Sequence, residues 1–419
     1  MSEAAPVPAA EEHDPFRQVS YLRQALESPK RPIGFLLGAG CPLAVRTSDG
    51  QPLIPAIEGM TTKVISTVDA GASKLVLEAV RSRMTGGERN PNIEEYLSQI
   101  RMLREVASHL DPALLTDAAL EKLDREMCEA IYDLACVTLP GVDTPYHHLA
   151  AWTRGLSRSL PVQLFTTNYD LLLEESLEAA RVPYFDGFVG SKSAFFDPAA
   201  VEVDADLLPG RWARLWKLHG SVNWWLCDLG GVPEVVRAER RAGTARLIYP
   251  SHLKYDETRQ MPYLAMMDKL KAFLRLPAAI LVCAGFSFGD RHITALLRQA
   301  LSGNADAAVF GLIYGSLSEN ESAAKLARST PNLSILARDG GVIGTRPGRW
   351  GARATPDETP IGVAILGEGA GSGSVPRHLE VTLGDFASFG LFLRDLLGRK
   401  EPEVGEVQSA PVPGSHHGD

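Results

Sequence analysis

The sequence has few cysteines and lacks the cysteine pairs that hold a structural metal or a disulfide framework. No C-x-x-C pair occurs among its five cysteines, which are Cys41, Cys128, Cys136, Cys227 and Cys283. This argues against a zinc ribbon and fits a protein of the reducing cytoplasm. Two catalytic motifs are also missing. Without a complete G-x-x-x-x-G-K-[ST] phosphate loop an ATPase is disfavoured, and no G-x-S-x-G nucleophile elbow is present.

Clustered positive charge and long apolar runs are absent as well. The formal net charge is −9 and no long basic run occurs, so nothing in this chain indicates binding to nucleic acid. No apolar run approaches the roughly 20 residues of a membrane-spanning helix, and the acidic, Pro/Ala-rich start does not resemble a signal peptide. We therefore expect a cytoplasmic protein without a membrane partner. Its 45% hydrophobic and 22% charged residues are ordinary for a globular chain.

Strand and helix patterns alternate over most of the chain. Short apolar runs predict strands at residues 33–37, 162–165, 215–218, 278–284 and 307–313. The run AAILVCA at 278–284 is typical of a strand that is buried on both faces. Residues 58–140 have a helical pattern throughout, which indicates a helical insertion. The whole predicts an α/β fold with a largely parallel sheet.

We divide the chain into three parts. Residues 1–30 are predicted to form a tail, disordered to about residue 13, and a helix that starts after Asp14. Residues 31–400 form the sheet domain with its helical insertion, and residues 401–419 form a disordered tail. Within the sheet domain, residues 338–377 are rich in Gly, Pro and Arg, and we expect a long loop there.

Four predicted strand ends carry polar or glycine-rich sequences: GAG at 38–40, FTTNYD at 165–170, HGS at 219–221 and GFSFGD at 285–290. Ligands of open α/β sheets bind at the carboxyl ends of the strands. If these strands are neighbours, all four segments open on one edge of the sheet. The predicted site therefore lies there.

The polar residues at these ends each have two interpretations. Asn168 is either a turn residue or a carboxamide that orients a water or a ribose hydroxyl, and Asp170 is best interpreted as the helix cap that braces this loop. His219 is either structural or a general base with a pKa near neutrality. Ser287 can bind a phosphate or ribose. Asp290 either takes a ribose hydroxyl or caps a helix.

The glycine pair at Gly38-Ala39-Gly40 allows backbone amides to approach a pyrophosphate, or it simply makes a tight turn. The dinucleotide fingerprint is incomplete, because Leu43 stands where it has a glycine. Glu58 lies at a distance from the pair that suits a ribose-binding acid. No histidine has a setting that predicts metal binding.

The ordered set of motifs resembles the sirtuin family, in its bacterial NAD-consuming branch. It comprises FLLGAG (35–40), NIEEYLSQI (92–100), FTTNYDLLLE (165–174), KLHGS (217–221), LIYPSHLKY (247–255) and GFSFGDRHI (285–293), and it spans roughly residues 30–300. The set is most similar to sirtuin-like subunits of anti-phage defence systems, including those that assemble with a HerA-type hexameric ATPase.

The resemblance implies a Rossmann-like sheet with an inserted helical subdomain and NAD bound between them as substrate, without a metal. Asn168 and His219 match the catalytic residues. The implied NAD-binding residues are Gly38, Ala39, Gly40, Thr167, Asp170, Gly285, Ser287 and Asp290. The chain departs from the family at Cys41-Pro42, and we interpret Cys41 as a small apolar filler rather than a nucleophile.

The implied activity is hydrolysis of NAD to nicotinamide and ADP-ribose, which would deplete NAD during phage infection. The zinc-binding cysteines of deacetylating sirtuins are missing, which makes protein deacetylation less favoured. The alternatives are an NAD-dependent protein deacylase or ADP-ribosyltransferase, and a non-catalytic NAD-binding regulatory subunit. Because NAD loss harms the cell, we expect control by self-assembly into a homo-oligomer or by a partner such as the HerA-type ATPase.

Overall fold

The structure is a computed structural model that describes residues 11–84, 90–107, 114–155, 158–203, 207–228, 233–239, 245–248, 262–352, 356, 358–366 and 378–398. The predicted tail at 401–419 and most of the LIYPSHLKY stretch lie outside these ranges.

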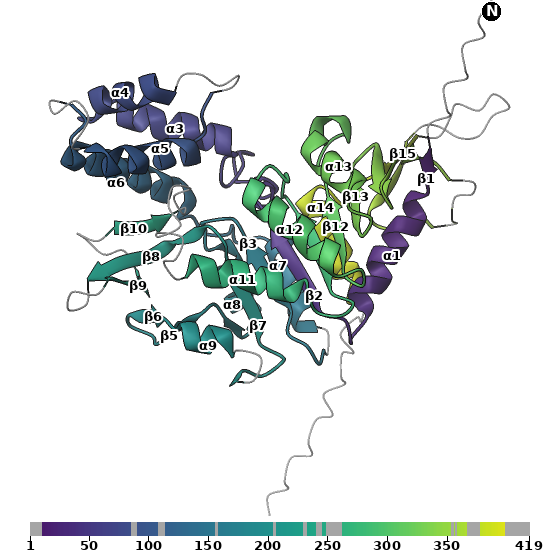
Figure 1. Ribbon diagram of the computed structural model, residues 1–419. Coiled ribbons are helices and arrows are strands. Elements are labelled where there is room, and N and C mark those ends of the chain that lie inside the picture. Colours follow the sequence, from purple (N-terminus) through teal and green to yellow (C-terminus); the bar gives the residue numbers. More distant parts are fainter. Residues whose placement is uncertain are drawn as a thin grey trace, which may run out of the picture.

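A ten-stranded sheet forms the centre of the described part of the molecule (Figure 1). Its order is β1-β15-β14-β13-β12-β11-β2-β3-β7-β4. The strands are β1 (Glu12–His13), β2 (Ile33–Leu37), β3 (Gln163–Thr166), β4 (Tyr184–Phe185), β7 (Ala213–Lys217), β11 (Ile280–Ala284), β12 (Ala308–Leu312), β13 (Leu333–Leu336), β14 (Gly340–Ile343) and β15 (Arg346–Trp350). From β13 to β4 every pairing is parallel, which confirms the predicted α/β class.

The order of the six central strands is that of a doubly wound Rossmann sheet. The chain starts in the middle at β2, continues outward to β3 and β7, then returns to the other side of β2 for β11, β12 and β13. This corresponds to the strand order 3-2-1-4-5-6, whose switch point lies between β2 and β11. The register aligns the strand ends in one row, formed by Lys217, Thr166, Leu37, Ala284 and Leu312. The predicted motifs therefore follow one edge of the sheet.

Helices cover both faces of the sheet, because the strands alternate apolar residues between two cores. On β2, Phe35 contributes to the core with α1 (Pro15–Glu27), α7 (Pro145–Gly155), α8 (Leu172–Ala179) and α14 (Phe386–Leu396). Leu36 contributes to the opposite core, with α11 (Tyr263–Phe273), α12 (Arg291–Gly303) and α13 (Glu321–Arg328). A run such as IGFLL is apolar throughout because both of its faces are buried.

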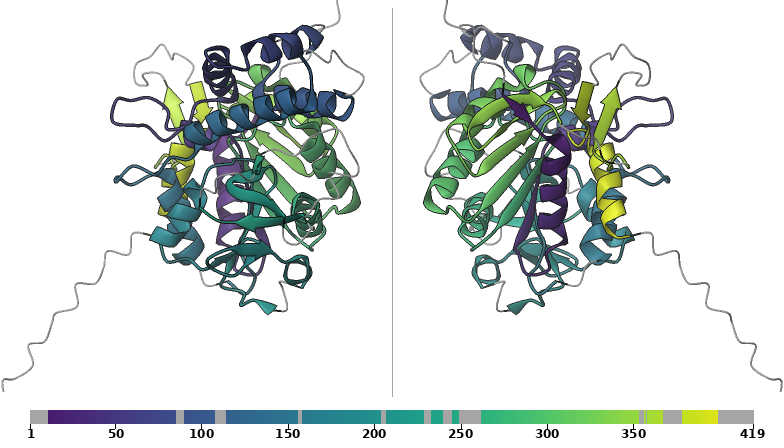
Figure 2. Two further views of the ribbon diagram at one scale, coloured as in Figure 1. Left: turned by 90° about the vertical axis from the view of Figure 1, so that its left-hand side faces the viewer. Right: turned by 90° about the vertical axis from the view of Figure 1, so that its right-hand side faces the viewer.

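Four of the helices between β2 and β3 form the insertion: α3 (Ile57–Asp69), α4 (Lys74–Met84), α5 (Ile93–Glu105) and α6 (Asp117–Ala135). They pack on one another at one end of the molecule, beside the strands β8 and β10 (Figures 1 and 2). The start of α5 has a capping box. Asn92 accepts from the amide of Glu95, and the Glu95 carboxylate accepts from the amide of Asn92.

A second, antiparallel sheet follows β4 and was not anticipated from the sequence as a unit. Its order is β10-β8-β9-β6-β5. The strands are β5 (Phe188–Val189), β6 (Ala194–Phe196), β8 (Gly220–Asp228), β9 (Pro233–Arg237) and β10 (Ala245–Ile248), with α9 (Pro198–Glu202) beside them. The long strand β8 leaves the main sheet directly after His219, so this sheet is anchored at the predicted site.

The predicted long loop at 338–377 is wrong in its described parts. β14 and β15 form an antiparallel hairpin that extends the main sheet, and β16 (Val363–Leu366) pairs with β17 (His378–Val381). The hairpin turn places Gly344 and Thr345 at positive φ, as a tight two-residue turn requires. Gly341 is needed inside its strand, because a Cβ there would lie 2.5 Å from the carbonyl oxygen of Ile335.

The predicted disorder up to residue 13 is also wrong at its end, since Glu12 and His13 form β1 and pair in parallel with β15. None of the helices within the described ranges is long and apolar enough to cross a bilayer.

Candidate active site

A cavity of about 1000 Å³ opens at the carboxyl edge of the sheet, where the doubly wound order places its switch point. The segments after β2, β3, β7, β11 and β12 line it, together with the first turn of α5. All of the predicted site residues except Gly38 are among the lining residues: Ala39, Gly40, Thr167, Asn168, Asp170, His219, Gly285, Ser287 and Asp290. Glu58 does not line the cavity and lies exposed on α3.

Asn168 is held in a defined orientation at the cavity wall. Its side-chain Nδ2 donates to the carbonyl oxygen of Gly38 at 3.1 Å, and its backbone amide donates to Oγ1 of Thr166 at 3.0 Å. Asn168 as a residue is only 9% exposed. Gly38 thus lies beneath the wall and connects the segment after β2 to the segment after β3. A carboxamide fixed in this way can present its oxygen to a bound water or hydroxyl.

His219 forms a pair with Asp290 across the cavity. The ring nitrogen Nε2 of His219 lies 2.9 Å from Oδ2 of Asp290. The other oxygen, Oδ1, caps α12 by accepting from the amides of His292 and Ile293. Burial alone would raise the pKa of Asp290, but the hydrogen bond and charge of His219, together with the two amides, lower that pKa to about 2. Asp290 therefore stays ionised and orients the imidazole.

A buried lysine holds the segment after β3 from below. Nζ of Lys217 donates to the carbonyl oxygens of Tyr169 and Asp170 and lies 2.9 Å from Oε1 of Glu174. The lysine side chain is 2% exposed. Asp170 is also buried, and burial raises its pKa to about 6 even though the charge of Lys217 lowers it. The N-cap of α8 is Leu171, one residue after the predicted position, yet Oδ1 of Asp170 accepts from the first helical amide, that of Leu172.

The glycines of the two switch-point segments are needed because these segments touch. A Cβ on Gly38 would lie 2.4 Å from the carbonyl oxygen of Gly285, and a Cβ on Gly285 would lie 2.5 Å from the amide nitrogen of Cys41. The amide of Gly40 donates to the carbonyl oxygen of Gly285 at 2.9 Å. Side chains at these positions would separate the two segments. The glycines therefore allow the two segments to touch, and this contact forms the floor of the cavity.

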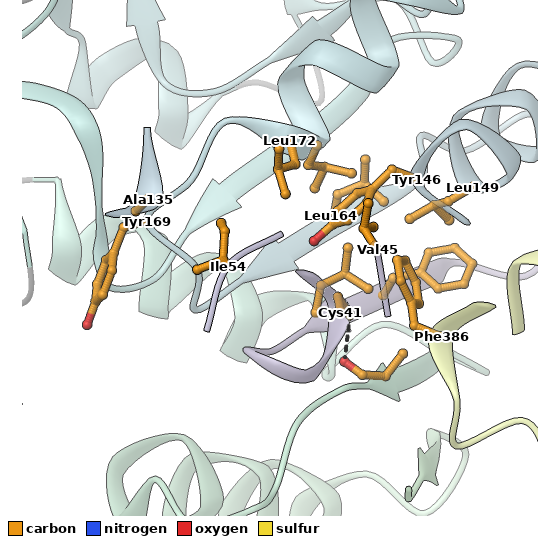
Figure 3. Packing of buried hydrophobic residues seen from close by; sticks show 14 of the residues in the cluster. Cys41, Val45, Ile54, Ala135, Tyr146, Leu149, Leu164, Tyr169, Leu172 and Phe386 are labelled. Atoms are coloured by element: carbon orange, nitrogen blue, oxygen red, sulfur yellow. Dashed lines mark hydrogen bonds between the residues drawn. The ribbon is translucent and has the colours of Figure 1, made fainter. Parts of the chain in front are cut away.

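Cys41 is an apolar filler, as predicted. It is completely buried in the core cluster with Val45, Tyr146 and Phe386, and its thiol donates to the carbonyl oxygen of Ala284 at 3.3 Å (Figure 3). Burial raises the pKa of this thiol well above its ordinary value. A thiolate nucleophile is therefore disfavoured at this position.

Two cavity residues, Glu94 and Arg291, were missed by the sequence analysis. Glu94, in the first turn of α5, accepts a hydrogen bond from the Tyr169 hydroxyl at 2.7 Å and lies 4.0 Å from Nδ1 of His219. Arg291, the first residue of α12, is exposed at the rim and supplies positive charge. The stretch that contains Glu94 was recognised in the motif set, but no local signal places a helix of the insertion against His219.

The two remaining predicted residues are Ser287 and Thr167. Ser287 accepts from the amide of Gly289 at 3.3 Å, and the amide of Thr167 donates to the carbonyl oxygen of Leu37. Among the residues that the structure describes, no group of three or more His, Cys, Asp or Glu side chains is arranged to hold a metal ion.

Comparison with known proteins supports a sirtuin-like domain. The family model described as the SIR2-like domain matches residues 162–333, which is less than half of the chain and runs from the start of β3 into β13. No curated protein matches. Similar solved structures include one described as the structural basis for the mechanism and regulation of Sir2 enzymes (13% identity, 73% of this chain and 88% of that chain covered, TM-score 0.36). A Sir2 homologue in complex with NAD is another (13%, 72%, 84%, TM-score 0.34). At these values the fold assignment rests on the strand order itself.

Proposed function

We propose that this protein is an NAD hydrolase that converts NAD to nicotinamide and ADP-ribose. The observation that carries the proposal is the His219–Asp290 pair, at 2.9 Å, in a cavity that also holds an oriented Asn168. An ionised acid that orients a histidine is a common arrangement for a general base. The match of residues 162–333 to the SIR2-like domain supports NAD as the substrate.

The residues present fit a dinucleotide. A volume of about 1000 Å³ is at the upper end of the range for small-molecule sites. The cavity lies over the switch point, where doubly wound sheets bind nucleotides, and Gly40 and Gly285 are among the residues of its floor. Arg291 at the rim supplies a cation for a pyrophosphate. We assign the reacting ribose to the side of Asn168 and His219.

The reaction breaks the bond between the anomeric carbon of the ribose and the pyridinium nitrogen, and water supplies the new oxygen. Nicotinamide leaves as a neutral molecule, so one proton must be removed from the water. Asn168 would hold the water, and His219 would accept the proton directly or through a ribose hydroxyl, while Asp290 stabilises the resulting imidazolium. Such general-base catalysis typically contributes about 100- to 10,000-fold in rate.

The test is to incubate the purified full-length protein with NAD over a range of protein concentrations and to quantify nicotinamide and ADP-ribose. We expect Asn168→Ala and His219→Ala each to lower the rate at least about 100-fold. His378→Ala, which changes an exposed histidine of β17, is the matched control and should keep the wild-type rate. Equal rates in all four proteins would contradict the assignment of the site.

The same assay decides between the alternatives. Mass spectrometry of the products separates free ADP-ribose from an ADP-ribosylated or deacylated protein, as a transferase or deacylase would give. Recovery of intact NAD after binding would instead indicate a regulatory subunit.

The biological role and the partners rest on the sequence resemblance. We propose that the hydrolase acts in bacterial anti-phage defence, in the cytoplasm, and that a homo-oligomer or a HerA-type hexameric ATPase controls it. Size-exclusion chromatography with light scattering, alone and with such an ATPase, tests both assemblies. A monomer that is fully active at every concentration and does not bind the ATPase would contradict this control.

A further inference from the structure

One carboxylate of the helical insertion reaches the segment that carries Asn168. Oε1 of Glu94 accepts a hydrogen bond from the hydroxyl of Tyr169 at 2.7 Å, and Tyr169 is the residue after Asn168. The two partners come from different parts of the fold, since Glu94 lies on α5 and Tyr169 follows β3. Tyr169 directs its hydroxyl away from the apolar cluster around Cys41 (Figure 3).

Both ends of this hydrogen bond are held by their own surroundings. On α5, the capping box of Asn92 and Glu95 fixes the first helical turn, and the amide of Ile93 donates to Oγ1 of Thr61 on α3 at 2.9 Å. The side chain of Ile93 is completely buried. The position of Glu94 is therefore set by the packing of the insertion.

On the other side, the backbone of Tyr169 is fixed to the end of β7 and the start of β8. Its carbonyl oxygen accepts from the amide of Val222 at 2.9 Å, from Oγ of Ser221 at 3.4 Å and from Nζ of Lys217 at 3.4 Å. Tyr169 as a residue is only 8% exposed, and a buried tyrosine usually finds a hydrogen-bond partner for its hydroxyl. Glu94 is that partner.

We propose that Glu94 is a positioning residue of the active site, which ties the segment carrying Asn168 to the helical insertion through the Tyr169 hydroxyl. The hydrogen bond to Tyr169 at 2.7 Å carries the effect, rather than the charge that faces Nδ1 of His219 at 4.0 Å. It follows that the active site is complete only while α5 stays docked. The effect on rate rests on the proposed NAD hydrolysis, whereas the effect on the segment does not.

The first measurement is independent of the chemistry. Hydrogen–deuterium exchange of the full-length protein is followed in peptides that cover residues 165–173. We expect faster exchange there in Glu94→Ala and Tyr169→Phe than in the wild type. The control Glu58→Gln, which alters an exposed acid on α3, should exchange at the wild-type rate. Glu94→Gln keeps an oxygen that accepts from Tyr169, so it should restore most of the protection that Glu94→Ala loses.

The second measurement is the rate of nicotinamide release. Loss of a hydrogen bond to a charged group predicts a kcat about 10-fold lower in Glu94→Ala and in Tyr169→Phe, with KM changed less than about 2-fold. The double variant should be no worse than either single variant, because both remove the same interaction. Thermal unfolding of each variant shows whether the whole domain has been lost.

The outcomes separate this proposal from the proposed function. Unchanged exchange at 165–173 in Glu94→Ala and Tyr169→Phe overturns the positioning role whatever the enzyme does. A slow Glu94→Gln together with a wild-type Tyr169→Phe also overturns it, because the charge would then matter instead of the hydrogen bond. If the wild type releases no nicotinamide, the proposed function fails, and the exchange measurement still decides the role of Glu94.

Discussion

Replacing Asp170 by asparagine should stabilise the protein near neutral pH and leave its stability almost unchanged in acid. Asp170 is 5% exposed, and burial raises its pKa from 3.8 to about 6, although the charge of Lys217 acts in the opposite direction. Asparagine keeps an oxygen that accepts from the amide of Leu172, so the capping interaction survives. The substitution therefore removes mainly the cost of ionising a buried carboxyl group.

The sign and size of the effect follow from proton linkage. Because the pKa of Asp170 is higher in the folded state, folding binds its proton more tightly. The resulting stability is fully present below about pH 3.8 and is lost as the pH rises through about 6. At about 1.4 kcal/mol for each pH unit between these values, the loss amounts to about 3 kcal/mol. Most of it falls between pH 4 and pH 8.

Urea unfolding of wild type and Asp170→Asn at pH 4, 6 and 8 measures this difference. The variant should gain about 2 to 3 kcal/mol relative to the wild type between the first and the last pH. Asp197→Asn, which changes the capping aspartate of the short surface helix α9, serves as the control. A difference between wild type and Asp170→Asn that does not vary with pH would refute the argument that burial of the carboxyl group sets its pKa.

Three further predictions concern the two switch-point segments and the rim of the cavity. Asp290→Asn should reduce the dependence of the free energy of unfolding on pH in acid. The lowered pKa of Asp290 gives about 2 kcal/mol of stability, which is present above about pH 3.8 and lost as the pH falls through about 2. The same pH dependence between pH 4 and 2 in the variant and the wild type would contradict this. Gly285→Ala should lower the free energy of unfolding by at least about 1–3 kcal/mol, because the residue has a φ of +62° and faces the amide of Cys41. Gly303→Ala, in open space at the end of α12, should not lower it. Equal urea midpoints of the two variants would refute the argument. On the proposed function, Arg291→Ala should raise KM for NAD about 10-fold with kcat nearly unchanged, and an unchanged KM would remove Arg291 from the binding site.

Local patterns located the central strands because strands buried on both faces are apolar throughout. The predicted strand at 278–284 and the observed β11 differ only at the start, where Ala278 has a φ of +55° and cannot belong to a strand. The convergence of the motifs on one edge was also predictable, since parallel strands end on the same side of a sheet. The strand order and the identity of the neighbours had to come from the structure.

The elements that were missed depend on partners far away in the sequence. β1 forms only because Glu12 and His13 pair with β15, more than 300 residues later, and their own sequence contains no strand pattern. The hairpin of β14 and β15 was hidden by its glycines and Pro347, which favour a loop in isolation. Glu94 is the corresponding case in the site, because only the packing of the insertion brings it to Tyr169.

The alternatives that the sequence left open for the site residues turn out not to exclude one another. Asp290 was a candidate either for a helix cap or for the site, and its carboxylate does both, with Oδ1 on the amides of α12 and Oδ2 on His219. Asn168 likewise bonds within its turn and also faces the cavity. A helix that starts at the carboxyl end of a strand needs a cap there, and the second oxygen of the cap then points at the edge where ligands bind. The capping interaction therefore fixes the orientation in which Asp290 holds the histidine, and a substitution that keeps only the cap, such as Asp290→Asn, separates the two roles.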